Sequence, residues 1–334
     1  MFDGKKILIT GGTGSLGQAL TKRLLEYNID TIRIFSRNEN KQIEMENSID
    51  DKRLRFFLGD IRDYNRLVRA TEDVDIVFHA AALKHVPKIE YNPFEAIKTN
   101  IIGSQNIIDA CLINNVENAI AIGTDKAVSP LNTYGATKLL MEKLFVTANN
   151  YLDPNKHPTK FTAVRYGNVV GSSGSVIPRF ISQSKNKSKI TITDPKMTRF
   201  SITMDEALGF ILKAVKIGKG SEIFVPKLKA YSIMEVKQAL NEILGDHGEE
   251  VIGIRPGEKL HETLINKEEM RYAWEYEDLY IITPPLNPMF HPNVINETYN
   301  GIKKIKAMTA YSSDQVDRIS ISELKDIIKN SQLV

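Results

Sequence analysis

The sequence predicts an α/β protein with a doubly wound parallel sheet. Short apolar runs of strand length alternate with stretches of helical periodicity over residues 1–225. A glycine-rich turn, GGTGSLG at residues 11–17, joins the first predicted strand to the first helix. A later loop, residues 123–132, joins a buried strand to a helix that carries a tyrosine and a lysine four positions apart.

The first strand, Lys5–Thr10, leads directly into the glycine-rich turn, and a helical stripe follows from Leu16 to about Tyr27. Glycines at this spacing permit a tight turn, a backbone close to a pyrophosphate and close helix–strand packing. The alternative is a turn that binds nothing, but a strand before the glycines and a helix after them favour a dinucleotide site. The predicted cofactor contacts here are Gly11, Thr13, Gly14, Ser15, Leu16 and Gly17.

The end of the second strand predicts the cofactor's phosphate preference. That strand spans Thr31–Ser36, and Arg37 follows it with no acidic residue before Glu39. An acidic side chain at this place accepts from a ribose 2′-hydroxyl, whereas a cation suits a 2′-phosphate. The sequence therefore favours NADP over NAD, and a solvated arginine is the alternative. The predicted contacts are Ser36, Arg37 and Lys41.

Two further strands end in residues suited to the cofactor. The third, Leu54–Leu58, precedes Asp60, whose carboxylate either meets the adenine amino group or caps the next helix. The fourth, Asp75–His79, runs into small residues that let a cofactor lie against the backbone. The predicted contacts are Asp60, Ile61, Ala80, Ala81, Ala82 and Lys84, and for Lys84 a solvent-facing role is the alternative.

A helix is predicted from about Pro93 to Asn114, with Asn100 in its apolar middle. A buried amide needs hydrogen-bond partners, so we expect Asn100 to brace the neighbouring strand that ends at Gly123. We also count Asn100 among the cofactor contacts. The single cysteine, Cys111, lies on the apolar stripe of this helix and is predicted to be a core residue.

The loop after the strand Ala119–Ile122 carries the predicted chemistry. Three residues that can hydrogen-bond or move protons follow Gly123 directly, and the helix beyond them places a phenol and an ammonium on one face. A cation beside a phenol favours the phenolate and lowers its pKa. A solvated helix face is the alternative for this pair alone. The predicted catalytic residues are Thr124, Asp125, Lys126, Tyr134 and Lys138.

The second half of the chain predicts an anionic substrate. A strand at Phe161–Arg165 ends in a polar run, and loops beyond it carry Arg179, Arg199 and Arg255. Arginine matches phosphate oxygens bidentately, although any one of these three alone is equally compatible with a surface position. We divide the chain into a cofactor domain, 1–170 with 201–225 returning to it, and a substrate-binding domain, 171–200 with 226–334.

Composition is that of a globular enzyme. The chain has 334 residues, of which 42% are apolar and 25% charged, and its formal net charge is +3. This charge is too small to indicate nucleic acid or a membrane surface as a partner. No apolar run is long enough to span a membrane, and the first strand begins too near Met1 for a signal peptide. We therefore expect a cytoplasmic protein, with no metal site because the six histidines are scattered.

Together these residues resemble the extended short-chain dehydrogenase/reductases. More narrowly, the chain resembles the soluble, inverting UDP-N-acetylglucosamine 4,6-dehydratases that open pseudaminic acid synthesis, through the segments HAAALKHVP, KTNIIG, TDKA, YGATK, RYGNVVGS, GSVIP, MTRF and IRPGEKLHE. Related capsule enzymes carry methionine at the position of Tyr134, and retaining relatives are usually membrane-anchored. One departure is Gly123, where the family commonly has serine, so that Thr124 would serve alone.

The resemblance implies NADP as cofactor, UDP-N-acetylglucosamine as substrate and a homo-oligomer, often a hexamer. It implies that Tyr134 takes the C4 hydroxyl proton with the help of Lys138 and Thr124, that Lys126 removes the C5 proton, and that Asp125 protonates the leaving C6 hydroxyl. The implied substrate contacts are Lys84, Tyr166, Asn168, Val176, Arg179, Thr198, Arg199, Arg255 and Glu258. The alternatives are a UDP-sugar 4-epimerase, a retaining dehydratase and a non-enzymatic NADP-binding sensor.

Overall fold

The computed structural model describes residues 1–150, 152–153, 156–171, 175–285, 287–292, 294–305 and 308–330. Residues 172–174, where the segments RYGNVVGS and GSVIP meet, lie outside the described residues. Within the described part, the strands of the central sheet are β1 (Lys6–Thr10), β2 (Thr31–Ser36), β3 (Leu54–Leu58), β4 (Ile76–His79), β5 (Asn118–Ile122), β6 (Lys160–Val164), β10 (Ile223–Pro226), β14 (Ala273–Tyr276), β15 (Leu279–Ile282) and β16 (Lys303–Lys304).

The order of these strands makes a doubly wound sheet, as the sequence predicts. Across the described chain the order is β16-β14-β15-β10-β6-β5-β4-β1-β2-β3, and every neighbouring pair from β10 to β3 is parallel. The chain moves outward from β1 through β2 to β3, then returns to the other side of β1 to place β4. This reversal between β1 and β4 is a topological switch point, where ligands of such sheets bind outside the carboxyl ends of the strands.

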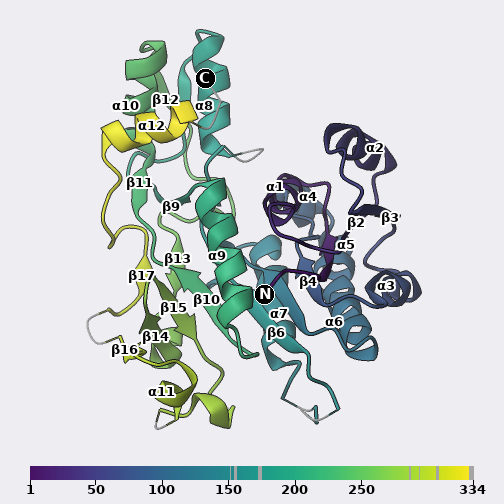
Figure 1. Cartoon of the computed structure of the whole chain (residues 1–334). Coiled ribbons are helices and arrows are strands. Elements are labelled where there is room, and N and C mark those ends of the chain that lie inside the picture. The colour runs from purple at the N-terminus through teal and green to yellow at the C-terminus, as the bar shows by residue number, and fades with distance from the viewer. Residues whose placement is uncertain are drawn as a thin grey trace.

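Helices cover both faces of the sheet (Figure 1). Those that pack on it are α1 (Ser15–Leu24), α2 (Glu39–Ser48), α3 (Tyr64–Thr71), α6 (Gly103–Ile113), α7 (Thr133–Thr147) and α9 (Met204–Ile217). Along β1, Ile7 and Ile9 pack into one core while Leu8 packs into the other, as alternation along a strand requires. The first core contains α1, α2 and α9, and the second contains α3, α6 and α7.

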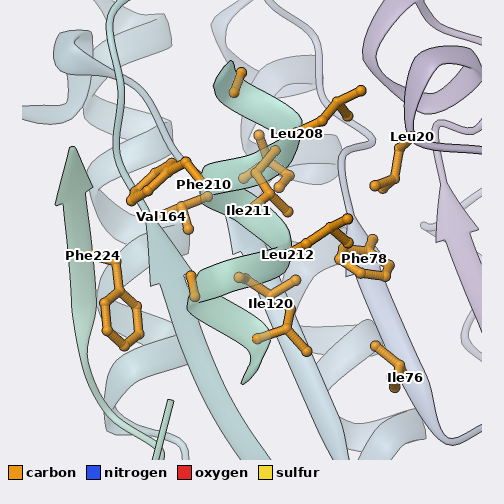
Figure 2. Close-up of a cluster of buried hydrophobic side chains, with 14 of the residues drawn as sticks. Leu20, Ile76, Phe78, Ile120, Val164, Leu208, Phe210, Ile211, Leu212 and Phe224 are labelled. Carbon is orange, nitrogen blue, oxygen red and sulfur yellow. The ribbon is translucent and has the colours of Figure 1, made fainter. Parts of the chain in front are cut away.

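The side chains of α9 show how the first core closes. Leu208, Ile211 and Leu212 belong to the same buried cluster as Ile120 and Phe78 of the sheet. Figure 2 shows these α9 side chains lying over the strands, with Leu20 of α1 beside them. Because α9 follows residues 171–200 in the chain, its packing here returns residues 204–226 to the nucleotide-binding part, and β10 then pairs with β6.

The remaining elements form a third core and an antiparallel extension. The third core joins α8 (Val176–Lys185), β8 (Ile190–Ile192), β11 (Ala230–Ser232), α10 (Ile233–Leu244) and α12 (Ile321–Asn330). Figure 1 shows α8, α10 and α12 grouped at one end of the molecule. The other short strands are β7 (Asn168–Val169), β9 (Thr198–Ile202), β12 (Glu249–Val251), β13 (Thr263–Ile265) and β17 (Tyr311–Ser312).

The domain division drawn from the sequence stays a prediction, with one structural difference from it. Residues 226–334 were assigned wholly to the substrate-binding part, but β14, β15 and β16 lengthen the central sheet by antiparallel pairing onto β10. Trp274 and Phe290 also pack into the first core. The far C-terminal segment thus supports the sheet as well as the third core.

The helix predicted over residues 93–114 is divided in the structure. After α4 (Val86–Tyr91), it consists of α5 (Pro93–Ala96), a π-helical stretch η1 (Ile97–Ile102) and α6. The short 3₁₀ helices are η2 (Asp125–Ala127), η3 (Glu269–Tyr272) and η4 (Pro288–Phe290), and a further short α-helix is α11 (Ile295–Thr298). A π-helical stretch often marks a functional site, and this one contains Asn100.

Candidate active site

A cleft of about 1010 Å³ opens at the carboxyl ends of the parallel strands, beside the switch point. The turn after β1, the ends of β2 and β3, the small residues after β4 and the loop after β5 all contribute to its walls. Of the predicted cofactor contacts it is lined by Gly11, Thr13, Gly14, Ser15, Leu16, Gly17, Ser36, Arg37, Lys41, Asp60, Ile61, Ala80, Ala81, Ala82, Lys84, Tyr134 and Lys138.

The glycine-rich turn has the geometry of a phosphate cradle. Gly11 has a φ of +68°, and a Cβ there would lie 2.9 Å from the Cα of Ala81, so a side chain would fill the cleft floor. A Cβ on Gly17 would lie 2.5 Å from the backbone of Gly12, which explains why helix and turn pack so closely. Gly14 occupies the N-cap of α1 without a side-chain cap, leaving backbone N–H groups for an anion. These residues fit a dinucleotide pyrophosphate.

Cations surround the end of β2. The Arg37 guanidinium is half exposed and lies 3.5 Å from the Asp60 carboxylate. Arg62 holds the same carboxylate more tightly, with its Nη2 2.7 Å and its Nε 2.9 Å from Oδ2. Burial of Asp60 is outweighed by these arginine contacts, which lower the pKa of the carboxyl. Since Arg62 already holds Asp60, most of the Arg37 charge faces the cleft.

Asn100 does not line the cleft, which corrects its prediction as a cofactor contact. Its side chain is fully buried. Its Oδ1 accepts from the backbone N–H of Leu83 at 2.8 Å, and its Nδ2 donates to Leu83 O at 2.9 Å and to Thr137 Oγ1 at 3.0 Å. Asn100 therefore braces the loop after β4 against α7. The brace expected from the sequence exists, but it joins a different segment from the strand that ends at Gly123.

The loop after β5 brings an acid and an amine together. Lys126 Nζ lies 3.0 Å from Asp125 Oδ1 and 3.2 Å from Asn168 Oδ1. Thr124 is the N-cap of η2, and its hydroxyl donates to Asp125 Oδ1 at 2.9 Å. Lys126 lines the cleft, whereas Asp125 is 1% exposed and lies beneath it, with Oδ2 buried and without a hydrogen-bond partner among the described residues. The pair is arranged for proton exchange between its members.

Tyr134 and Lys138 both line the cleft, but they are not coupled as the sequence predicts. Burial raises the pKa of Tyr134, while the nearby Lys126 ammonium and a hydrogen bond with Thr124 lower it in part. Lys138 instead donates from Nζ to Ile122 O at 2.5 Å. Burial lowers the pKa of Lys138 to about 8, against the opposing pull of Glu142. The cation that acts on the phenol is therefore Lys126, because the Lys138 amine is bonded to the end of β5.

The structure explains the glycine at position 123. The backbone N–H of Gly123 donates to Val164 O at 2.7 Å, and a Cβ on Gly123 would lie only 2.4 Å from that oxygen. A serine here would require β5 and β6 to shift apart. Thr124, the next residue in the chain, presents a hydroxyl that lines the first cavity.

A second cavity of about 340 Å³ adjoins the first. Lys126, Asn168 and Arg255 line both cavities, so the loop after β5 lies where they meet. Of the predicted substrate contacts, Lys84 and Tyr166 line the first cavity, while Val176, Arg179, Arg199 and Glu258 line the second. Arg179 donates from Nη2 to Thr191 Oγ1 at 2.6 Å and otherwise faces this cavity.

Two predicted substrate contacts have other partners in the structure. Thr198 is 2% exposed and lines neither cavity; its hydroxyl bonds to His261 Nδ1 at 2.8 Å and to Ser313 Oγ at 2.7 Å. Arg199 is 5% exposed, and its guanidinium donates to the backbone carbonyls of Thr198, Lys259 and Leu260. Both residues hold the segment 258–262 in place instead of presenting free donors to a phosphate.

Sequence reasoning assigned no role to Glu262, although it belongs to the quoted segment IRPGEKLHE. Its carboxylate lines the second cavity, with Oε1 3.9 Å from Lys126 Nζ. It also missed Ser313, whose Oγ accepts from the N–H of Glu262 at 2.9 Å. The position of Glu262, an acidic residue in the same short segment as the predicted substrate contact Arg255, was a signal that could have indicated it. The residues around 313 carry no comparable pattern.

A buried ion cluster joins α7 to the C-terminal half. The Arg165 guanidinium, fully buried at the end of β6, binds both oxygens of Glu142 on α7 and both oxygens of Glu269 on η3. Arg165 also donates to Leu264 O at 2.8 Å. Burial and these two carboxylates oppose each other, and the carboxylates raise the pKa of Arg165. The cluster fixes α7, β6 and the segment after β13 relative to one another.

Fold and site together define a member of the extended short-chain dehydrogenase/reductase class. The chain belongs to the family described as "Polysaccharide biosynthesis protein", whose model matches residues 7–284. It is 47% identical over 337 residues to the inverting UDP-N-acetylglucosamine 4,6-dehydratase of Campylobacter jejuni, covering 99% of each chain. It is 41% identical to a protein of Rickettsia bellii named UDP-glucose 4-epimerase, covering 100% of this chain and 98% of that one.

A solved structure with a similar fold matches the whole length of the chain. The X-ray structure of Pen from Bacillus thuringiensis matches with a TM-score of 0.90 and 40% identity, covering 100% of both chains. In the described part of the present chain, no helix is long and apolar enough to cross a membrane. Over the same residues, no group of three or more His, Cys, Asp or Glu side chains is placed to hold a metal ion.

Proposed function

We propose that this protein is a UDP-N-acetylglucosamine 4,6-dehydratase that inverts C5, giving UDP-2-acetamido-2,6-dideoxy-β-L-arabino-hex-4-ulose. The observation that carries the proposal is the position of Lys126, which lies where the two cavities meet and is hydrogen-bonded to Asp125. A nucleotide-sugar oxidation needs a phenol or phenolate beside the cofactor, and Tyr134 supplies it. Elimination of water from the oxidised sugar needs an additional base and acid, and this pair provides both.

A dinucleotide held in the cleft by the glycine-rich turn would supply hydride chemistry at C4 and C6 of the sugar. Tyr134 takes the proton of the C4 hydroxyl, and Thr124 hydrogen-bonds the same oxygen. The resulting ketone acidifies the C5 proton, which Lys126 removes as a neutral amine. Asp125 gives its proton to the departing C6 hydroxyl, and water leaves. Because Asp125 is buried beneath Lys126, its carboxyl reaches the sugar only after the loop of residues 124–127 adjusts.

We propose NADP as the cofactor. Arg37 and Lys41 line the cleft at the end of β2, and no carboxylate there is free to accept from a ribose 2′-hydroxyl, since Arg62 binds Asp60. Positive charge at this place matches a 2′-phosphate. The UDP moiety of the substrate fits the second cavity, where Arg179 and Arg255 supply cations for its phosphates.

We further propose that the product feeds synthesis of a surface sugar of the pseudaminic acid type and that the enzyme is a homo-oligomer. Large apolar side chains of Tyr91, Phe94 and Leu140 are exposed on neighbouring helices and are compatible with a subunit contact. Light scattering after size exclusion measures the oligomeric state directly.

The deciding experiment is incubation with UDP-N-acetylglucosamine, followed by mass spectrometry and NMR of the fresh product. Inverting dehydration is expected to give a product lighter by one water with the L-arabino configuration at C5. The same mass with unchanged C5 configuration identifies a retaining dehydratase. Binding of cofactor without turnover of any nucleotide sugar identifies a sensor.

A UDP-sugar 4-epimerase is the second candidate, because the Rickettsia bellii relative carries that name at 41% identity. An epimerase shares the phenol and the dinucleotide cleft but has no need of an acid and an amine paired after Thr124. Its product has the mass of the substrate, so the same incubation separates the two functions.

A further inference from the structure

Glu262 presents an unusual buried carboxylate at the edge of the second cavity. Its side chain is 4% exposed, and Oε1 lies 3.9 Å from Lys126 Nζ and 3.8 Å from Arg199 Nε. Neither distance is a hydrogen bond, and Oε2 is buried with no partner among the residues that the structure describes. Buried carboxylates are normally hydrogen-bonded, so one held without such bonds beside a reactive amine needs a functional explanation.

The backbone, and not the side chain, holds Glu262 in position. Its N–H donates to Ser313 Oγ at 2.9 Å, and its carbonyl accepts from Ser313 N at 2.8 Å and from Ser312 Oγ at 3.3 Å. Ser313 is tied in turn to Thr198 on β9. The C-terminal segment therefore carries the carboxylate to Lys126 although the side chain gains no hydrogen bond there.

Lys126 lies between two carboxylates, Asp125 at 3.0 Å and Glu262 at 3.9 Å. The other charged groups facing this cluster are Arg199 on β9 and Lys259, and the phenols of Tyr134 on α7 and Tyr231 on β11 lie in the same field. Burial alone would lower the pKa of the Lys126 amine, but the two carboxylates outweigh burial and raise it. Burial and Asp125 raise the pKa of Glu262.

We propose that Glu262 is a positioning residue for Lys126, whose negative charge holds the amine in its ammonium form until substrate binds and so sets the pH at which the C5 base becomes active. The role as C5 base rests on the proposed function. The effect of Glu262 on the amine does not depend on it.

The proton balance shows why this charge matters. Lys126 becomes a base when its ammonium proton moves across the 3.0 Å hydrogen bond to the Asp125 carboxylate. The N–H bond breaks, an O–H bond forms, and the pair now contains the neutral amine and the carboxylic acid that elimination requires. A negative Glu262 stabilises the ammonium and opposes this transfer. A neutral group at residue 262 favours this transfer. Separately, because it removes a negative charge 3.9 Å from the ammonium, it lowers the pH at which the amine loses its proton to solvent.

The first test needs no substrate. The protein is labelled with trace acetic anhydride across a pH series, and acetylation of Lys126 is measured by peptide mass spectrometry against the exposed Lys52 in the same digest. Acetylation requires the free amine, so its midpoint reports the Lys126 titration. Glu262→Gln is expected to move that midpoint down by about one to two pH units, the size of effect that a charge within 4–6 Å produces. Glu262→Asp, which keeps the charge, should shift it less.

Glu258→Gln is the matched control, because Glu258 lies on the same segment, 3.5 Å from Arg199, and has no contact with Lys126 among the described residues. It should leave the Lys126 midpoint where it is in the unsubstituted protein. If Glu262→Gln fails to fold, Glu262→Met supplies a neutral side chain of similar size, and thermal unfolding of each variant is measured first.

The second test is the pH profile of kcat for dehydration of UDP-N-acetylglucosamine. Its acidic limb should move to lower pH in Glu262→Gln, in the direction of the acetylation midpoint, whereas a merely structural role would lower kcat equally at every pH. An unchanged acetylation midpoint in folded Glu262→Gln, or an equal shift in Glu258→Gln, overturns the inference. An enzyme that shows the acetylation shift but does not dehydrate the sugar overturns the proposed function and leaves the control of Lys126 by Glu262 standing.

Discussion

The two sides of the active site are built in different ways. On the cofactor side, the contacts follow their strands directly, and glycines, alanines and backbone groups form the cradle after β1 and β4. On the substrate side, the ionisable groups come from distant segments, since Lys126 follows β5, Arg199 lies on β9 and Glu262 precedes β13. Those groups are largely buried and are placed by contacts across the fold.

This difference predicts which substitutions change ligand binding alone and which change both binding and stability. A cradle of backbone N–H groups and small residues forms wherever the strand–turn–helix unit folds, and it buries no unpaired charge. A buried cluster of carboxylates and cations is stable only while every member has its partner. Substitutions on the cofactor side should therefore alter binding with little loss of stability, whereas those in the buried ion clusters should alter both.

The largest expected effect tests the division of chemistry between the two sides. Tyr134→Phe should slow C4 oxidation itself, because the phenol that takes the hydroxyl proton is lost. Lys126→Ala should still oxidise C4 but lose C5 deprotonation. Each should lower turnover by about 10²–10⁴-fold, the usual contribution of a positioned proton-transfer group. The first readout is single-turnover absorbance, in which reduced nicotinamide should appear for Lys126→Ala but not for Tyr134→Phe. The second readout is deuterium exchange at C5, which neither variant should show.

The exposed Lys185→Ala on α8 serves as the control and should behave as the unsubstituted protein. Normal C5 exchange in Lys126→Ala would show that Lys126 is not the C5 base, and would contradict the proposed division of chemistry between the two sides.

The next effect concerns the cluster that joins the sides. Arg165→Met should lower the free energy of unfolding by about 3–5 kcal/mol, because it leaves the buried carboxylates of Glu142 and Glu269 without their cation. Chemical denaturation measures the loss. Arg271→Met, which breaks an ion pair with Glu268 that is 68% exposed on both sides, should cost less than about 1 kcal/mol. Similar losses of unfolding free energy in Arg165→Met and Arg271→Met would show that burial does not explain the contribution of the Arg165 cluster to stability.

A smaller effect concerns acid stability on the cofactor side. His79 is fully buried between Thr10 Oγ1 and Ser104 Oγ, and burial, together with Lys138, lowers its pKa to about 3. A histidine with a lowered folded-state pKa contributes stability that is complete above about pH 6.5 and is lost as the pH falls towards 3. By about pH 4.5 the loss should be on the order of 2–3 kcal/mol.

Unfolding free energies at neutral and acidic pH measure this contribution of His79. His79→Gln should show a flatter dependence on pH than the unsubstituted protein. Parallel pH curves for His79→Gln and the unsubstituted protein would assign acid sensitivity to other groups.

The smallest expected effect concerns cofactor choice. Arg37→Ala should weaken NADP binding by roughly 10-fold, equivalent to ~1.4 kcal/mol, because it removes one half-exposed cation from the 2′-phosphate position. Binding of NAD should change little, and unfolding should stay as in the unsubstituted protein. Calorimetry with both dinucleotides measures the difference. An equal loss for both would place the Arg37 side chain away from the 2′-phosphate.

Much of the fold was predictable because local patterns specify it. The bounds of β2 and β3 agree with the sequence prediction, and those of β1 differ by one residue. The helix predicted over 93–114 was right in extent but gave no indication of the π-helical stretch around Asn100. Within that stretch, Asn100 hydrogen-bonds to Leu83 and Thr137, which lie 17 and 37 positions away in the chain.

The same contrast holds for the candidate site, where features set by local sequence were predictable and those set by distant contacts were not. The glycine turn and the loop with Lys126 were predictable, because each follows a buried strand whose carboxyl end must reach the ligand edge of the sheet. The prediction that Lys138 lowers the pKa of Tyr134 was wrong for this structure, since spacing along a helix places two side chains on one face without choosing their partners. Thr198 and Arg199 also have partners that no spacing rule indicates.

By itself, the sequence determined the class of fold and indicated the candidate residues for a dinucleotide cradle and for proton transfer. Periodicity, glycine positions and residue types are local properties, and they act over a few residues of chain. Only the tertiary structure decided which charges face one another, because Lys126 and Glu262 are 136 positions apart in the numbering and meet through the packing of β9 and the C-terminal segment. Electrostatic fields act through space, so the state of Lys126 is a property of the folded protein.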